Sequence, residues 1–146
     1  MFLTKTYEVC DAKKYYQGVI SQALSPNIDC NSVRCKIRKT QNGSNSYVRM
    51  AIGTSSTNNI TIGHDASANN KILLGEMRNG SFAQTQTSAD LSLNTWHTLE
   101  LTKNEAIVSL KVDDTTISLS NVQVSMDKVI SISTNTYGQF SDVIIL

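Results

Sequence analysis

Carboxylate side chains are the first residues of this sequence that could support catalysis, because a positioned pair can exchange protons and attack a substrate. The four glutamates are Glu8, Glu76, Glu100 and Glu105, and only the last two lie within a few residues of each other, across a predicted turn. No nucleophile elbow surrounds any of the serines. A phosphate loop and a dinucleotide fingerprint are also missing from the sequence. We therefore predict that the chain is not an enzyme.

Cysteine and histidine are the residues that could bind zinc. The spacing of Cys30 and Cys35 is too wide for a standard zinc knuckle, and no second close pair accompanies His64 or His97 as further ligands. Three cysteines, counting Cys10, are an odd number, so at least one thiol stays free or pairs between chains. We predict that all three are reduced and structural, with no metal and no cofactor.

Composition limits the classes of partner. Thirteen Lys and Arg against 12 Asp and Glu give a net charge of +1, which argues against nucleic-acid binding. Ser, Thr and Asn together supply 46 of the 146 residues. No apolar run is long enough to span a membrane, and no signal peptide is visible at the N-terminus. We expect a single domain over residues 1–146 that does not insert into a membrane.

The elements that would position a site are predicted by a period-two alternation of apolar and polar residues, which is typical of strands with one buried face. In 33–38 the apolar side chains of Val33, Cys35 and Ile37 share one face. The opposite face carries basic side chains, which are either a solvated surface or a shallow site for anionic sugars or phosphates. These basic residues are Arg34, Lys36, Arg38 and Lys39.

Turn signals join these strands. Asn-Gly at 42–43 predicts a hairpin between 33–38 and 47–52, and Asn79-Gly80 predicts another between 71–77 and 81–85. A three-strand meander is expected over 96–101, 107–112 and 116–119, followed by strands at 128–132 and 142–146. Short helical turns are expected only at 11–16 and 125–127. The pattern predicts an all-β fold, an antiparallel β-sandwich of jelly-roll type. The predicted core comprises Val33, Cys35, Ile37, Val48, Met50, Ile52, Trp96, Leu99, Leu101, Val108, Leu110 and Val112.

The stretch 94–119 carries a family resemblance. Trp96-His97 opens a strand, apolar residues alternate through Leu99 and Leu101, and the next strand ends in Val112-Asp113. This arrangement resembles the concanavalin A-like lectin/glucanase superfamily, above all its laminin G-like modules, of the kind found in phage tail and surface adhesion proteins. The closing strand at 140–145 is similar to the last strand of such modules. The resemblance implies the concanavalin A-like sandwich.

The same resemblance sets expectations for single residues. We expect Trp96 to seal one end of the core and His97, on the opposite face, to be exposed. Glucanase members carry a Glu-x-Asp-x-x-Glu triple on one strand, which this sequence lacks. Members that bind calcium use loop oxygens, but the nearest cluster here, Asp65 with Asn69 and Asn70, has too few carboxylates.

Two functions remain open at this point. One is a module that binds a glycan or cell-surface polymer within a viral tail, fibre or surface adhesin. The other is a structural module that makes protein contacts in such a particle without binding sugar. Either places the protein in a virion or at an extracellular surface, with other subunits or identical copies as further partners. For a ligand site we predict outward-facing aromatic, basic and polar side chains of the sheet and its adjoining loops. These residues are Tyr47, Arg49, His64, Asp65 and Tyr137.

Overall fold

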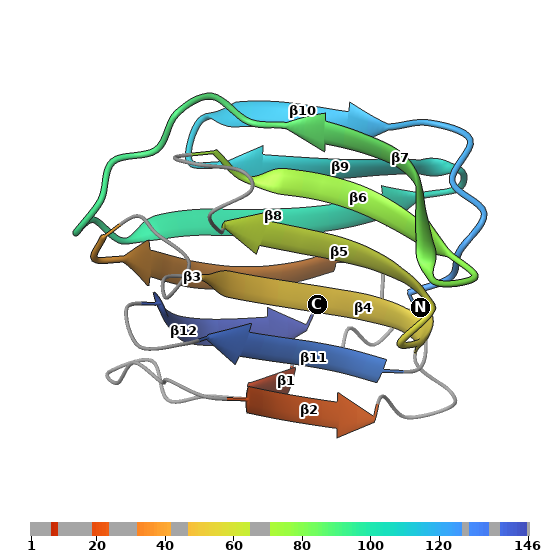
Figure 1. Ribbon diagram of the computed structural model, residues 1–146, viewed down its shortest axis with the longest axis horizontal. Coiled ribbons are helices and arrows are strands. Elements are labelled where there is room, and N and C mark those ends of the chain that lie inside the picture. Colours follow the sequence, from red (N-terminus) through yellow and green to blue (C-terminus); the bar gives the residue numbers. More distant parts are fainter. Residues whose placement is uncertain are drawn as a thin grey trace, which may run out of the picture.

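The computed structural model describes residues 7–8, 19–23, 32–41, 47–64, 71–126, 129–134 and 138–145. Their strands form two six-stranded antiparallel sheets, one behind the other in Figure 1. The first sheet contains, in spatial order, β1 (Tyr7–Glu8), β12 (Gly138–Ile145), β3 (Ser32–Lys39), β8 (His97–Asn104), β9 (Ile107–Val112) and β10 (Thr115–Leu119). The second contains β2 (Val19–Ala23), β11 (Val129–Thr134), β4 (Val48–Ser55), β5 (Asn58–His64), β6 (Leu73–Arg78) and β7 (Ser81–Thr87). The predicted antiparallel β-sandwich is confirmed.

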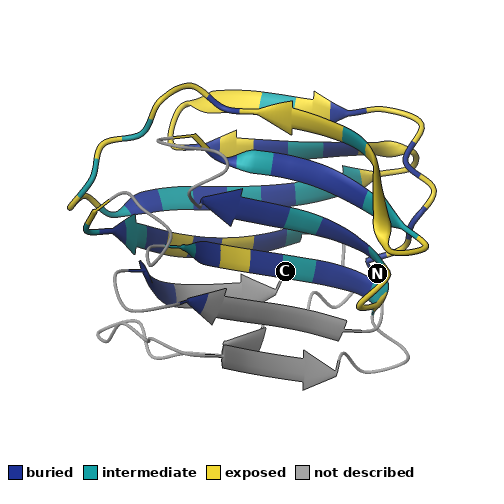
Figure 2. Cartoon of the chain, viewed as in Figure 1, coloured by how far each residue is buried: buried dark blue, intermediate teal, exposed yellow. Residues whose placement is uncertain are grey.

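The core lies between the two sheets and is built from alternate residues of each strand. Along β4, buried and accessible side chains take turns, as Figure 2 shows, because successive side chains of a strand point to opposite faces. All the predicted core residues are buried except Trp96, which is only half-buried. The second sheet adds Ile60, Ile62 and Leu74, and Ile72 packs beside them just before β6; none of the four is more than 2% exposed.

The hairpin predicted between 33–38 and 47–52 is wrong. β3 pairs with β8 and β12 in the first sheet, whereas β4 pairs with β5 and β11 in the second. The connection 40–47 is long enough to cross the ~10 Å between packed sheets. Alternation shows that a strand has one buried face, but it does not show to which of the two sheets the strand belongs.

The other predicted turns are confirmed. β6 and β7 pair across Asn79-Gly80, where both residues have positive φ angles, 52° and 83°. β8, β9 and β10 form the predicted meander, and its two turns contain Glu105 and Asp113, each with φ of 52°. Asparagine, aspartate and glycine adopt this left-handed conformation more easily than most residues.

Two segments differ from the sequence prediction. β5 was not expected, because the polar pair Asn58-Asn59 hides the alternation of the isoleucines that pair with β4. The helical turn predicted at 125–127 is not formed in its described part, up to Met126. Instead Val122, Val124 and Met126 are buried in alternation, so this segment runs extended along the core. The helix predicted at 11–16 lies outside the described residues.

Candidate functional site

The outer face of the second sheet brings together side chains from four consecutive strands. Core residues Met50, Ile62 and Leu74 point inward, so their neighbours along the chain point away from the core. Three rows of paired residues cross the strands on this side: Arg49, Gly63, Leu73 and Thr87; Ala51, Thr61, Gly75 and Thr85; and Gly53, Asn59, Met77 and Phe82. We call these rows together the β4–β7 face. Its middle row carries only small side chains.

Phe82 is the most conspicuous side chain of the β4–β7 face. It is 45% exposed, although it is a large apolar residue. A Cβ atom on Gly75 would lie 2.6 Å from its Cε1 atom, so the ring lies directly over this glycine. The ring therefore offers an aromatic surface beside the middle row. Phe82 was not among the predicted site residues, and the one signal in the sequence was an aromatic residue just after the Asn79-Gly80 turn.

Two of the predicted site residues, Tyr47 and Arg49, come together at the other side of the same face. Arg49 is exposed, and its guanidinium carbon lies 4.5 Å from the centre of the Tyr47 ring. This is a cation–π contact, and it holds the guanidinium flat against the ring. Arg49 pairs with Gly63 on β5, which has no side chain to cover it from that strand. Tyr47 itself is half-buried.

The remaining predicted site residues are placed differently. His64 was expected in an exposed loop, and this expectation is wrong: it is the last residue of β5 and only 1% exposed. It pairs with Val48 and shares the parity of Ile60 and Ile62, which puts its side chain on the core side of the sheet. Asp65 and Tyr137 lie outside the described residues.

His97, predicted to be exposed, is buried instead. It precedes Leu99 by two residues on β8, so the alternation of that strand places it inward and Trp96 outward. Its Nδ1 donates to Asp113 Oδ2 over 2.7 Å, and Asp113 Oδ1 accepts from the backbone N–H of Thr98 over 3.0 Å. Burial alone would raise the pKa of Asp113, but the hydrogen bonds from His97 and Thr98 lower it.

A cavity of about 440 Å³ is lined by Ser92, His97 and Asp113. His97 lies between the serine and the aspartate and contacts both, as the histidine of a serine-hydrolase triad does. In such a triad, the histidine Nε2 must accept the proton of the serine hydroxyl. Here Nε2 lies 2.8 Å from the backbone carbonyl oxygen of Ser92, so it faces a hydrogen-bond acceptor and not the serine hydroxyl. The Ser92 hydroxyl is farther away, at 3.5 Å. The contacts therefore tie the 88–92 segment to the β9–β10 turn and do not activate a nucleophile.

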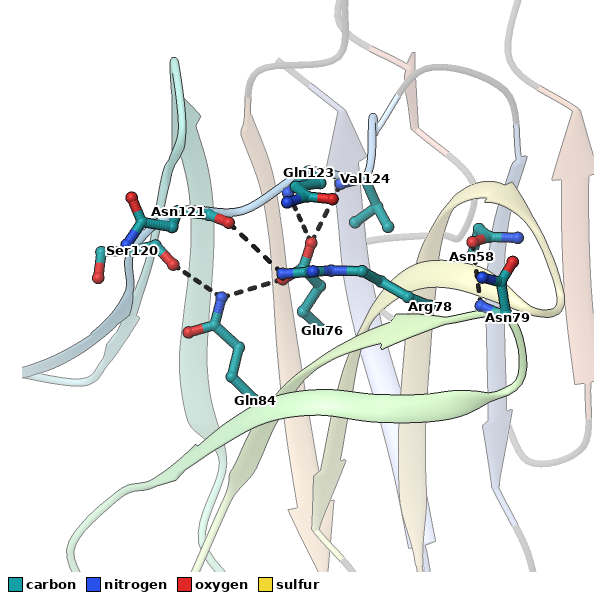
Figure 3. A network of polar contacts seen from close by, with 9 residues as sticks. All are labelled: Asn58, Glu76, Arg78, Asn79, Gln84, Ser120, Asn121, Gln123 and Val124. Atoms are coloured by element: carbon teal, nitrogen blue, oxygen red, sulfur yellow. Dashed lines mark hydrogen bonds and ion pairs between the residues drawn. The ribbon is translucent and has the colours of Figure 1, made fainter.

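Glu76 is a fully buried glutamate at the edge of the core (Figure 3). Its Oε1 accepts from Arg78 Nη2 over 2.7 Å and from Gln84 Nε2 over 2.9 Å. Its Oε2 accepts from the backbone N–H groups of Gln123 and Val124 over 2.6 and 3.1 Å. Burial alone would raise its pKa, but these four donors lower it to about 2. A general acid needs a raised pKa, so this carboxylate is a structural anion and not a catalytic acid.

The basic stripe lies on the outer face of the first sheet and is shorter than predicted. Arg34 and Lys36 are exposed there, whereas Lys39 is fully buried, because it shares the inward parity of the apolar residues of β3. The guanidinium carbon of Arg38 lies 4.6 Å from the centre of the Trp96 ring. Trp96 therefore packs on the outside of the sandwich and does not seal the core.

Metal ligands do not gather in the part of the chain that the structure describes: no group of three or more His, Cys, Asp or Glu there could hold an ion. The Cys35 side chain is buried in the core. The calcium candidates Asp65, Asn69 and Asn70 lie outside the described residues, as do Cys10 and Cys30. No helix among the described residues is long and apolar enough to cross a membrane.

Solved structures share this architecture. A galectin of Caenorhabditis elegans matches with a TM-score of 0.65 and 10% identity, over 92% of this chain and 96% of the galectin. A carbohydrate-binding module of Bacillus subtilis matches with a TM-score of 0.64 and 11% identity, over 98% of this chain and 93% of the module. This chain therefore shares the β-sandwich fold of these two proteins.

A protein described as a native glycosidic hydrolase shares the same fold, with a TM-score of 0.66 and 10% identity, over 100% of this chain and 97% of the hydrolase. No protein-family model matches the sequence, and no curated protein matches it. The fold expected from the resemblance is thus confirmed.

Proposed function

We propose that this chain is a non-catalytic recognition module that binds a glycan or cell-surface polymer on its β4–β7 face. The observation that carries this proposal is the exposed ring of Phe82, which lies over Gly75. The row of small side chains that contains Gly75 lies between the row of Phe82 and the row of Arg49. A fold shared with a carbohydrate-binding module supports it.

The chemistry of the face suits a sugar. Arg49 and Gly53 mark the outer rows on β4 and are four residues apart, roughly 13 Å at about 3.3 Å per residue. A sugar ring lying over Ala51 and Thr61 would stack on Phe82 at one side. At the other side, its hydroxyl or carboxylate oxygens would reach the planar donors of Arg49.

The contact set we propose comprises Tyr47, Arg49 and Phe82, with Asp65 and Tyr137 as contacts from adjoining segments. His64 acts from beneath the face, because its side chain points toward the core and supports the strand that carries Thr61. Hydrolysis is not part of the proposal, because the four donors around Glu76 fix it as a structural anion.

A glycan array tests this function, first with the wild-type chain and then with its best ligand in a titration. Phe82→Ala should weaken binding about tenfold or more, since burying an aromatic ring is worth about 1.5–3 kcal/mol. Ile107→Ala is the matched control, because Ile107 is 51% exposed on the opposite sheet. Equal losses in both variants, or no array ligand at all, would refute the proposal.

For its setting, we propose a viral tail, fibre or surface adhesin, with other subunits of that particle as partners. The support is compositional: Ser, Thr and Asn make up nearly a third of the chain, as is common in surface-exposed adhesive proteins. Immunolabelling of intact particles or cells tests this location. Label confined to the interior of the cell would contradict it.

A second candidate function is assembly without sugar binding, and the edge strand β7 favours it. β7 pairs only with β6 within the second sheet, and its seven residues carry no charge. Charged residues usually guard such edges against pairing with another chain, and two identical edges can pair around a two-fold axis. Light scattering of wild type and Thr85→Lys tests this. A defined oligomer that dissociates in the variant supports assembly, and a monomeric wild type excludes this route.

A further inference from the structure

A second polar cavity opens at the end of the sandwich where the β4–β5 turn, the β6–β7 turn and the 123–125 segment meet. Its volume is about 300 Å³, at the lower end of the range for ligand pockets. Only one of the residues that line it is apolar, and the others carry amide, hydroxyl or guanidinium groups. The lining residues are Thr54, Asn58, Arg78, Asn79, Gln123, Val124 and Ser125.

Arg78 is the one charged residue among those that line this cavity, and hydrogen bonds fix its guanidinium group. Its Nη2 donates to Glu76 Oε1 over 2.7 Å and reaches the backbone oxygen of Asn121 at 3.5 Å. Glu76 is itself fixed by three further donors, as Figure 3 shows. The guanidinium is therefore preorganised, so a ligand would not have to immobilise a flexible side chain.

The Nε–H group of Arg78 is a buried donor that makes no hydrogen bond with the described residues. Its Nε is shielded from solvent, and no acceptor among the described residues lies within bonding distance of it. A buried donor without an acceptor is unfavourable, and nearly all such groups in folded proteins find a partner. Nε itself lies below the surface, so an oxygen atom of a ligand in this cavity would contact the exposed part of the Arg78 side chain, which is 32% exposed.

The neighbouring groups define what kind of oxygen this would be. The charge of Arg78 is balanced by Glu76, so the cavity does not select an anion by net charge. Amides from three segments line it, and Asn58 is oriented by accepting from the backbone N–H of Asn79 over 3.1 Å. Amide and hydroxyl groups both donate and accept hydrogen bonds, which matches the neighbouring hydroxyl groups of a sugar.

We propose that this cavity is a second binding site, which takes one neutral sugar residue through adjacent hydroxyl groups, with Arg78, Asn79 and Gln123 as the contacts. It goes beyond the β4–β7 face and does not depend on it. Arg78 and the core share one side of β6, whereas Phe82 and Gly75 belong to the other side of the sheet. A chain with both sites could hold two residues of one polysaccharide, or two separate chains.

Protein-observed NMR tests the second site with a panel of neutral monosaccharides: glucose, galactose, mannose and fructose. We expect at least one of them to shift the Arg78 Nε–H signal and the side-chain amide signals of Asn79 and Gln123, in a saturable way. Asn79→Gly keeps the positive φ of the turn, and Gln123→Ala keeps the backbone bond to Glu76. Combining the two should weaken this binding about tenfold or more, while the melting temperature reports whether the fold is kept.

Phe82→Ala separates the two sites. If only the β4–β7 face proposal fails, the monosaccharide shifts at Arg78 persist in wild type and in Phe82→Ala alike. If no panel sugar shifts these signals, or if the Asn79→Gly/Gln123→Ala variant binds as tightly as wild type, the second site is overturned. Saturable binding of sulfate or glucuronate in place of every neutral sugar also overturns the assigned ligand class.

Discussion

Replacing Glu76 by glutamine should destabilise the fold in a way that depends on pH. Four donors converge on this carboxylate, and all of them need an acceptor. The amide of Glu76→Gln keeps one acceptor oxygen and presents an NH₂ group in place of the other. Two of the four donors therefore lose their partner, and Arg78 loses its counter-charge.

The size of the effect follows from the lowered pKa of Glu76. A pKa of about 2, against 4.5 for an ordinary glutamate, corresponds to a stabilisation on the order of 3 kcal/mol at neutral pH. Because the folded-state pKa is depressed, this contribution is complete above pH 4.5 and is lost as the pH falls toward 2. The difference in unfolding free energy between wild type and Glu76→Gln should shrink by roughly 2 kcal/mol between pH 6 and pH 3.

Urea unfolding, followed by the fluorescence of the single tryptophan, Trp96, measures this difference at each pH. Glu105→Gln serves as the control, because Glu105 is exposed in the β8–β9 turn and should change stability by less than about 0.5 kcal/mol. A difference for Glu76→Gln that is equal at pH 6 and pH 3, or below about 1 kcal/mol at pH 6, would refute the reasoning.

Three further experiments test the buried residues. His97→Ala removes the hydrogen bond that His97 donates to Asp113 and should lower the unfolding free energy by about 2 kcal/mol in urea. An unchanged urea midpoint would contradict this. Ile60→Ala should lower the unfolding free energy by about 3 kcal/mol, because it leaves a cavity in the core. Ile107→Ala, at an exposed position, should change it by less than about 0.5 kcal/mol. Similar losses in the two variants would contradict the assigned core. With the other cysteines changed to serine, Cys35 should react with a thiol reagent only on unfolding, and rapid labelling of the native chain would contradict its burial.

The sequence predicted the strands better than their partners. Alternation identified the buried face of 33–38 and 47–52 correctly, since it depends only on the local pleat. It misassigned the pair as a hairpin, because partner choice depends on contacts across the sandwich that no local pattern encodes. Where two strands share a short Asn-Gly turn, as at Asn79-Gly80, local and tertiary preferences agree and the prediction was right.

The candidate site was predictable only in part. The outward position of Tyr47 and Arg49 was predicted, because it follows from the alternation of their own strand. The alternation along β8 also places the His97 side chain inward, on the same face as Leu99 and Leu101. The prediction placed Trp96 in the core instead, and therefore placed His97 on the outer face. Phe82 could not be recognised as a platform, because its position over Gly75 depends on the register between β6 and β7, which contains an irregularity.

Gly75→Ala tests the central proposal most directly, because it moves the Phe82 ring without removing it. The new methyl group would lie 2.6 Å from Cε1 of the ring, which must swing away, while the strand backbone can stay in place. We predict an unchanged far-UV spectrum and a melting temperature close to that of wild type. Affinity for the best array glycan should fall about as far as in Phe82→Ala. A folded Gly75→Ala variant that binds this glycan as tightly as wild type would contradict the account of the β4–β7 face.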